Sequence, residues 1–563
     1  MRMPLSSLAV TARDRSLHKL LDLPGEPRPY VREKDIPVPM IDGVVLLADR
    51  YQPADASGPL PVVMVRCPYG RRGLVAALTV LPLAMSGFQV LIQSTRGTFG
   101  SGGEFRPFCH EAEDGAATLA WVREQRWCDG RVATAGASYL GHTQWAVVPF
   151  AEPPVEAACL DVTAARLTSA FYTGGVPNLR NALGWAQLIG RQERTVLPAV
   201  VPTPRTVLRL RKAVRSRPLQ AADVTVAGAQ VLFWRDFCEH SLPGDSHWTQ
   251  ADHQDADVAA MPPVSMVSGW WDLFAAEQFD DFVRLQNAGK QVQLTVGPWM
   301  HGDPGQVAEI AKASVRWLGR HLDATDGEGD DNSEAGDRAP LRLYLQGAGR
   351  WLNLDRWPPS GSTDTTLYLR PHGSLADRPL PVGAGPTVFT YDPADPTPSV
   401  GGPLLSRPGG QADNGKIEAR PDVVTFTGPP LFDPLDIVGE VRATVHVRAD
   451  RPYADVFVRL CDVDEHDVSR NVVDGIRTLA PNGLTAGADG VSDVAVRLFP
   501  TAYRVPAGHR LRVQVAAGAF PRYRTNPGTG ESFATATSGV PCRIEVLHDA
   551  AHPSRVVVPV FRG

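Results

Sequence analysis

The predicted pattern of secondary structure changes near residue 360, and that change limits the folds open to this chain. Upstream, short apolar runs rich in β-branched residues alternate with helical stretches. A strand followed by a helix, repeated, is typical of a mostly parallel sheet covered on both faces. The predicted strands are residues 62–65, 89–92, 132–135, 264–267 and 293–296, and the predicted helices are residues 116–125 and 308–322.

Downstream of residue 360, strand-like runs follow one another with turn residues between them and no helical segment. In residues 510–515 polar and apolar side chains alternate strictly, as a half-buried antiparallel strand requires. We therefore expect a β-sandwich or jelly roll of roughly 200 residues. The runs are TTLYLR, VRATVHV, ADVFVRL, DVAVRLF, RLRVQVA, CRIEVL and RVVVPVF.

Residues 155–255 are predicted to be largely helical, with prolines as breaks, and they contain the basic stretch PRTVLRLRKAVRSRP. Such a stretch could bind nucleic acid or a membrane. Because the rest of the chain is not basic, we favour an amphipathic cap helix with a solvated polar face. The predicted division is a first part of an α/β core at 32–154, a helical cap at 155–255, a second part of the core at 256–357, and a β domain at 358–563.

Composition excludes several classes of protein. The 563 residues carry 56 basic and 61 acidic side chains, a formal charge of −5, so no global charge favours nucleic acid or anionic lipid. No run approaches the roughly 18–20 apolar residues that span a bilayer, and the N-terminal stretch has no apolar segment typical of a secretory signal. Seven cysteines form no C-x-x-C pair, so we expect reduced thiols in a cytoplasmic protein.

The acidic stretch DATDGEGDDNSEAGD, residues 323–337, is nearly free of apolar residues. We expect a mobile surface loop there rather than part of a core. Its carboxylates have no ordered ligand spacing, and this favours a loop over a metal site.

The sharpest local motif is GRVATAGASYLGHTQWA, in which a predicted strand runs into Ser138 and a helix begins. A serine on a tight strand-to-helix turn projects its hydroxyl above the sheet, and small residues at Gly136 and Gly141 let the chain turn. The usual elbow is G-x-S-x-G, whereas here Leu140 takes the place of the second glycine. On this motif alone, Ser138 is a candidate nucleophile or a helix cap.

Two later strand ends supply an acid and a base. The strand at 264–267 leads to Asp272, and the strand at 293–296 leads to His301. The chain order serine, acid, histidine is the order expected when each residue follows a successive strand of such a sheet. A strand, helix and strand separate acid from base, which brings both loops to one edge. The pattern therefore predicts a catalytic triad with Ser138.

An acyl-transfer site must also stabilise an oxyanion. The backbone N–H of Tyr139, directly after the serine, is one natural donor. The strand at 62–65 leads into Arg66-Cys67-Pro68-Tyr69, so the hydroxyl of Tyr69 could be the second donor. On spacing alone, Tyr69 is equally compatible with a packing role.

Several segments together resemble the CocE/NonD (cocaine esterase) family of serine hydrolases, which is similar to X-prolyl dipeptidyl-peptidases and α-amino-acid ester hydrolases. The matching stretches are MIDGVVLLADRYQP, VVMVRCPYGRR, TRGTFGSGGEF, WVREQRWCDGRVATAGASYLG, VSGWWDLF, VGPWMHG, FDPLDIVGEV and RLRVQVAAGAFPRY. The resemblance implies an α/β-hydrolase core, an inserted helical cap and a C-terminal jelly roll. It also implies these roles: Ser138 nucleophile, Asp272 acid, His301 base, Tyr69 hydroxyl and Tyr139 amide oxyanion hole, and Phe274 in the acyl pocket.

The chain departs from the family pattern at two places. The usual D-T-R-G before the elbow reads Ser94-Thr95-Arg96-Gly97, which alters a polar packing partner. Relatives that take α-amino esters carry carboxylates two and three residues after the catalytic Asp, whereas this chain has Phe274 and Ala275. A neutral aromatic residue there favours an uncharged acyl group.

These features predict two-step hydrolysis of a small carboxylic ester through an acyl-enzyme, with no metal or organic cofactor. One alternative is an X-Pro dipeptidyl-peptidase or amidase that acts on short peptides. Another is a non-catalytic protein that binds through its jelly roll, although such a protein would have no use for a complete triad. We expect no nucleic-acid or membrane partner, and the acyl part, the alcohol part and the oligomeric state stay open.

Overall fold

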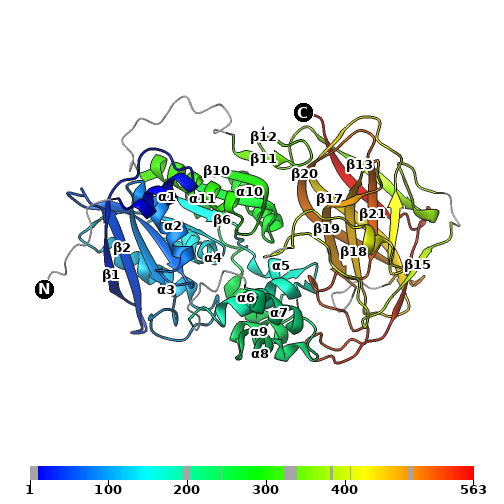
Figure 1. Ribbon diagram of the computed structural model, residues 1–563, viewed down its shortest axis with the longest axis horizontal. Helices are drawn as coiled ribbons and strands as arrows, with labels where there is room; N and C mark the ends of the chain where they lie inside the picture. The colour runs from blue at the N-terminus through cyan, green and yellow to red at the C-terminus, as the bar shows by residue number, and fades with distance from the viewer. Residues whose placement is uncertain are drawn as a thin grey trace.

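A computed structural model describes residues 10–193, 203–242, 244–322, 339–380, 384–405, 408–479 and 486–563. The chain forms an α/β part, a helical cap below its centre and a β domain at the other end of the long axis (Figure 1). None of the helices in these ranges is long and apolar enough to cross a membrane. The acidic stretch at 323–337 lies outside the described residues.

The α/β part is built on one sheet whose described strands run in the order β1-β2-β4-β3-β5-β6-β9-β10-β11-β12. From β4 to β11 every neighbouring pair is parallel, and antiparallel strands close both edges. The strands are β1 (Tyr30–Pro39), β2 (Val45–Pro53), β3 (Leu60–Cys67), β4 (Gln89–Ser94), β5 (Cys128–Ala137), β6 (Ala158–Asp161), β9 (Val264–Trp271), β10 (Val292–Met300), β11 (Leu341–Leu345) and β12 (Arg350–Leu354). The mostly parallel sheet is confirmed.

Helices cover both faces of this sheet, as buried parallel strands require. Side chains of α1, α2 and α11 share one apolar cluster with β3, β4 and β5, while side chains of α3 and α10 join a second cluster on the opposite face. The bounds are α1 (Ala12–Leu20), α2 (Leu74–Met85), α3 (Glu111–Arg123), α4 (Tyr139–Trp145), α10 (Ala275–Asn287) and α11 (Pro304–Leu322). Because the helices cover the two faces, a ligand site is expected at the carboxyl ends of the parallel strands.

The cap is helical, but the sheet continues past residue 155, because β6 lies between β5 and β9. Helices begin only at Leu167: α5 (Leu167–Phe171), α6 (Leu179–Ile189), α7 (Pro204–Ala213), α8 (Ala222–Ala227) and α9 (Leu232–Glu239). The basic stretch forms α7, as predicted, and its arginines are exposed.

The C-terminal part is a jelly-roll β domain. Its described strands run in the order β15-β22-β17-β23-β13-β14-β16-β21-β18-β19, and β20 pairs with β17. Two short helical turns, a 3-10 turn at Pro371–Gly373 and α12 (Gly415–Glu418), interrupt the described run of strands. The strands are β13 (Ser362–Arg370), β14 (Ser374–Ala376), β15 (Thr387–Tyr391), β16 (Val423–Thr427), β17 (Leu435–Ala449), β18 (Asp455–Val463), β19 (Ser469–Thr478), β20 (Ser492–Val505), β21 (Arg510–Ala516), β22 (Cys542–Val546) and β23 (Arg555–Phe561).

A two-stranded hairpin of the cap packs against the β domain. Its strands are β7 (Tyr172–Thr173) and β8 (Val176–Pro177), and its turn contains Gly174 with φ +56°. The carbonyl of Gly174 accepts a hydrogen bond from the Thr478 N–H at 3.1 Å. A methyl group at Gly174 would lie 1.8 Å from the carbonyl oxygen of Ile476, so only glycine permits this close approach.

We predict that Gly174→Ala destabilises the protein by roughly 1–3 kcal/mol, because the added methyl group must push β19 away from the hairpin. The matched control is Gly184→Ala in α6 of the same cap, where nothing lies within 4 Å of an added methyl group. The control should stabilise by about 0.5–1 kcal/mol through helix propensity. Thermal unfolding of both variants measures the difference, and equal melting temperatures would contradict a tight seam at Gly174.

Candidate active site

Ser138 lies on a strained turn between β5 and α4. Its backbone has φ 62° and ψ −123°, an unusual conformation for a residue with a side chain. Its N–H donates to the carbonyl of Asp161 at the end of β6, at 2.9 Å. The glycines around the turn have no room for side chains: an added methyl group would lie 2.5 Å from Leu140 at Gly136 and 2.5 Å from Thr163 at Gly141. The turn therefore needs glycine at both positions.

Asp272 and His301 meet at the ends of two neighbouring parallel strands. Asp272 follows β9 and His301 follows β10, and His301 Nδ1 lies 2.9 Å from Asp272 Oδ2. The Asp272 carboxylate is fully buried, and it also accepts hydrogen bonds from Gln306 Nε2 at 3.1 Å and from the Phe274 N–H at 3.0 Å. These three donors hold the carboxylate in place, so it can orient the imidazole.

Ser138 is at the same sheet edge as this pair. In the sheet, β6 separates β5 from β9, and Asp161 links the three strands because its carbonyl accepts from Ser138 and its Oδ1 accepts from the Val267 N–H at 2.9 Å. The structure has no hydrogen bond between Ser138 and His301 among the described residues. Catalytic hydrogen bonds are often long before substrate binds and shorten in the complex.

The hydroxyl of Tyr69, just beyond the end of β3, accepts a hydrogen bond from Trp185 Nε1 at 3.0 Å. This contact uses an oxygen lone pair and leaves the phenolic proton to donate elsewhere. Burial raises the pKa of Tyr69 above its usual value, which keeps the hydroxyl protonated. The Tyr69 ring packs edge-on against Tyr139, with 6.4 Å between ring centroids.

Tyr139 is anchored through its side chain. Its hydroxyl donates to Glu111 Oε1 at 2.8 Å and accepts from the Phe108 N–H at 3.0 Å. Glu111 is in turn paired with the buried Arg66 at 2.8 Å. As the first residue of α4, Tyr139 has a backbone N–H with no acceptor inside the helix, so this N–H can serve a ligand.

Phe274 lies between the acid and an apolar cluster. It precedes the first residue of α10, and its ring centroid is 5.8 Å from that of His301. The cluster joins all three parts of the chain, and its members include Phe108, Tyr139, Leu273 and Phe274 from the core, Phe171, Trp185, Phe233 and Phe237 from the cap, and Phe533 from the β domain. Phe274 thus belongs to an apolar cluster that contains many aromatic side chains.

Several residues that support these groups were not predicted from the sequence. Gln306 on α11 holds Asp272, Trp185 on the cap helix α6 holds Tyr69, and Glu111 at the start of α3 holds Tyr139. Only Gln306, five residues after His301, is close enough in sequence to have been suspected. The other two contacts depend on how distant helices pack.

The comparisons with known proteins agree with this architecture. Residues 42–303 match the model of the X-Pro dipeptidyl-peptidase S15 family, and residues 333–557 match the X-Pro dipeptidyl-peptidase C-terminal non-catalytic domain. A cocaine esterase of Rhodococcus sp. (strain MB1 Bresler) is 31% identical, with 95% of this chain and 99% of that protein covered. A putative serine esterase of Mycobacterium bovis is 24% identical, with 80% of each chain covered.

Two solved structures resemble the whole chain in fold. An α-amino acid ester hydrolase superposes with a TM-score of 0.75 at 21% identity, covering 99% of this chain and all of that one. A CocE/NonD family hydrolase from Staphylococcus aureus superposes with a TM-score of 0.68 at 17% identity, covering 95% of this chain and 94% of that one. With its sequence matches and its fold taken together, this chain belongs to the CocE/NonD family of serine hydrolases.

Proposed function

We propose that this hydrolase cleaves carboxylic esters through an acyl-enzyme on Ser138, with His301 as the base and Asp272 as the acid that orients it. The observation that carries the proposal is the 2.9 Å contact between His301 Nδ1 and the fully buried Asp272 carboxylate. A contact through Nδ1 leaves Nε2 of the same imidazole to exchange a proton with the nucleophile.

The proposed reaction has two steps. His301 takes the proton of the Ser138 hydroxyl while the oxygen attacks the ester carbonyl carbon, and the imidazolium then protonates the alcohol as the C–O bond breaks. In the second step water gives a proton to His301 and attacks the acyl-enzyme, which releases the carboxylic acid and restores Ser138. Each step passes through a tetrahedral oxyanion.

The Tyr69 hydroxyl and the Tyr139 N–H are the proposed donors to that oxyanion. Two features support Tyr69. Trp185 donates to a lone pair of the Tyr69 oxygen and leaves the hydroxyl proton free to donate, and the raised pKa of Tyr69 keeps that proton in place. For Tyr139, the support is the anchored side chain at the start of α4. Donors held in position before the reaction cost no reorganisation when charge develops.

We propose an uncharged acyl group as the substrate's acyl part, with Phe274 in contact with it. The apolar cluster that contains Phe274 favours an apolar group, whereas an α-amino ester or an X-Pro peptide brings a free ammonium that needs an anionic partner. Glu111, a buried carboxylate close to Tyr139, is already paired with Arg66 and bonded to the tyrosine.

A reducing compartment is the proposed location. All seven cysteines are free thiols, and most are buried. Reduced thiols are the rule in the cytoplasm, whereas oxidising compartments favour disulfides.

We predict that Ser138→Ala lowers kcat for p-nitrophenyl ester hydrolysis by a factor on the order of 10⁶, because the acyl-enzyme cannot form. The matched control is Ser374→Ala, at an exposed serine of the β domain, which should keep full activity. Circular dichroism checks that both variants fold. Residual turnover near the wild-type rate in folded Ser138→Ala would exclude Ser138 as the nucleophile.

Tyr69→Phe should reduce kcat by roughly 10²–10³ with little change in KM, because the lost hydroxyl acts mainly on the charged transition state. Trp185→Phe removes the donor to Tyr69 but keeps the phenol, so it should cost clearly less. Steady-state kinetics on one ester measures both variants. A wild-type kcat in Tyr69→Phe would show that Tyr69 packs in the site and does not stabilise the oxyanion.

Comparing three matched substrates tests the acyl preference. We expect kcat/KM to be highest for a neutral phenylacetyl p-nitrophenyl ester, at least tenfold lower for the α-amino analogue, and lowest for an X-Pro p-nitroanilide, because an unpaired ammonium loses its solvation in an apolar site. Faster cleavage of the anilide than of the neutral ester would favour a dipeptidyl-peptidase instead.

A further inference from the structure

The sheet face beneath α11 is polar where it would be expected to be apolar. Parallel strands covered by helices are usually apolar on both faces. On β10 the alternate residues Val292, Leu294 and Val296 follow that rule and lie in the main core, but Gln293 and Thr295 face α11.

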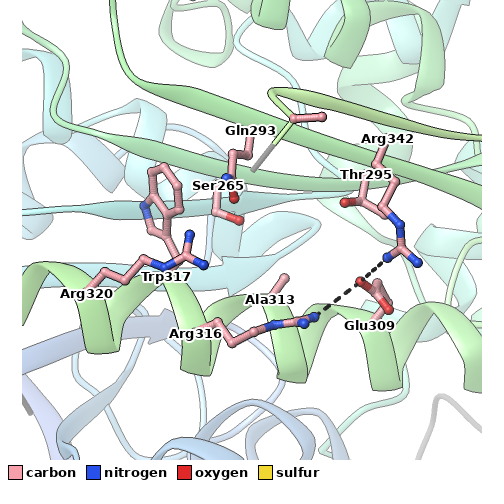
Figure 2. Close-up of a pocket in the computed structure, with 10 residues that line it drawn as sticks. Ser265, Gln293, Thr295, Glu309, Ala313, Arg316, Trp317, Arg320 and Arg342 are labelled. Carbon is pink, nitrogen blue, oxygen red and sulfur yellow. Dashed lines mark hydrogen bonds and ion pairs between the residues drawn. The ribbon is translucent and has the colours of Figure 1, made fainter. Parts of the chain in front are cut away.

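The neighbouring strands continue this polar surface. Ser265 on β9 pairs with Gln293, and Arg342 on β11 pairs with Thr295, so polar side chains lie side by side across three strands. Figure 2 shows them opposite α11. A departure from the expected pattern at adjacent positions often marks a functional site.

These side chains line a cavity of about 40 Å³, which we call the basic pocket. Its residues are Ser265, Gln293, Thr295, Glu309, Ala313, Arg316, Trp317, Arg320, Ala339 and Arg342. A single water needs roughly 10–15 Å³ by the same kind of measure, so there is room for a larger polar group. The short side chain of Ala313 leaves this space open under the helix.

Among the described residues that line the basic pocket, cationic side chains outnumber acidic ones. Glu309, the one acid among the described lining residues, is shared by Arg342 at 3.4 Å, Arg316 at 3.7 Å and Lys312 at 3.9 Å, and Lys312 also pairs with Asp22 at 3.4 Å. Arg320 forms no ion pair within the described ranges, and it lines the same cavity. Three arginines, of which Arg320 is exposed, and one carboxylate therefore line the described part of the pocket.

Donors without acceptors lie beside these cations. Ser265 is only 4% exposed, and its hydroxyl makes no hydrogen bond to any described residue. The side chains of Gln293 and Thr295 likewise make none in the described part of the chain. Buried polar groups normally have partners, so the Ser265 hydroxyl needs an acceptor that the described residues do not provide, whereas Gln293 and Thr295 are only half-buried.

We propose that the basic pocket binds a phosphate group. A phosphate offers several oxygens to donors that approach from different sides, and arginine forks match its geometry. Ser265 lies near the start of β9, whereas Asp272 follows the end of that strand, so this site is at the far end of the strands from the proposed triad. The proposal therefore does not depend on the proposed function.

Isothermal titration of the full chain with sodium phosphate, at ionic strength kept constant with KCl, tests this proposal. We expect saturable binding of one phosphate per chain. Arg320→Gln should weaken binding tenfold or more, and Ser265→Ala should weaken it severalfold, because each removes a donor. Glu309→Gln should tighten binding, since it removes the competing carboxylate and its charge.

The matched control is Arg205→Gln, at an exposed arginine of α7, which should bind phosphate like the wild type. A glycerol 1-phosphate titration distinguishes the two sources of the group: equal or tighter binding indicates a phosphate monoester, and loss of binding indicates free phosphate. Each of these two outcomes supports the proposal when the variants behave as stated.

Three results would overturn the proposal. The first is that the wild type shows no saturable binding heat up to roughly 10 mM phosphate or glycerol 1-phosphate, since a weaker site would be empty at ordinary metabolite levels. The second is an equal loss in Arg205→Gln and Arg320→Gln, which would indicate diffuse attraction to surface charge. The third is weaker rather than tighter binding in Glu309→Gln with an unchanged melting temperature.

Discussion

The hydrogen bond between Asp272 and His301 joins the ends of two neighbouring strands, and the rest of the site is arranged around it. It forms because β9 and β10 are parallel and, after a register shift between Gly297 and Met300, Met300 pairs with Trp271, so the residues that follow both strands arrive at the same edge. The carboxylate is fully buried, which is tolerable only because three donors surround it. Any shift between these strands would separate the acid from the imidazole.

All three parts of the chain reach this edge. The core carries the proposed catalytic residues, the cap supplies Trp185 to hold the hydroxyl of Tyr69, and the β domain adds Phe533 to the apolar cluster. The cap and the β domain also bond to each other at Gly174 and Thr478. The proposed active site therefore depends on packing between the parts as well as on the proposed triad.

Local sequence signals were enough to predict the sheet, the tight turn at Ser138 and the contact between Asp272 and His301. Apolar periodicity shows where buried strands lie, and the glycines at 136 and 141 mark a turn with no room for side chains. The strand β6 was not predicted because its four residues, Ala-Cys-Leu-Asp, include none of the β-branched residues that marked the predicted strands. Trp185 and Glu111 were not predicted because their contacts depend on long-range packing that no local pattern encodes.

The polar sheet face under α11 is visible in part from the sequence, but its meaning depends on long-range pairing. The run at 293–296 predicts a strand correctly, but Gln293 and Thr295 within it break the apolar pattern of a buried parallel strand. Only the register with Ser265 and Arg342 shows that these exceptions gather in one place. A polar residue in a buried strand thus indicates a site only when the residues beside it on the neighbouring strands are known.

The most direct test of the central claim is a crystal structure of the enzyme inactivated with diethyl p-nitrophenyl phosphate. The account predicts a diethyl phosphate ester on Ser138 Oγ. Its phosphoryl oxygen should lie within about 3 Å of both Tyr69 Oη and the Tyr139 nitrogen, with His301 Nε2 facing the ester oxygens. Phosphorylation of another residue, or an adduct on Ser138 with the His301 imidazole turned away and out of reach, would contradict it.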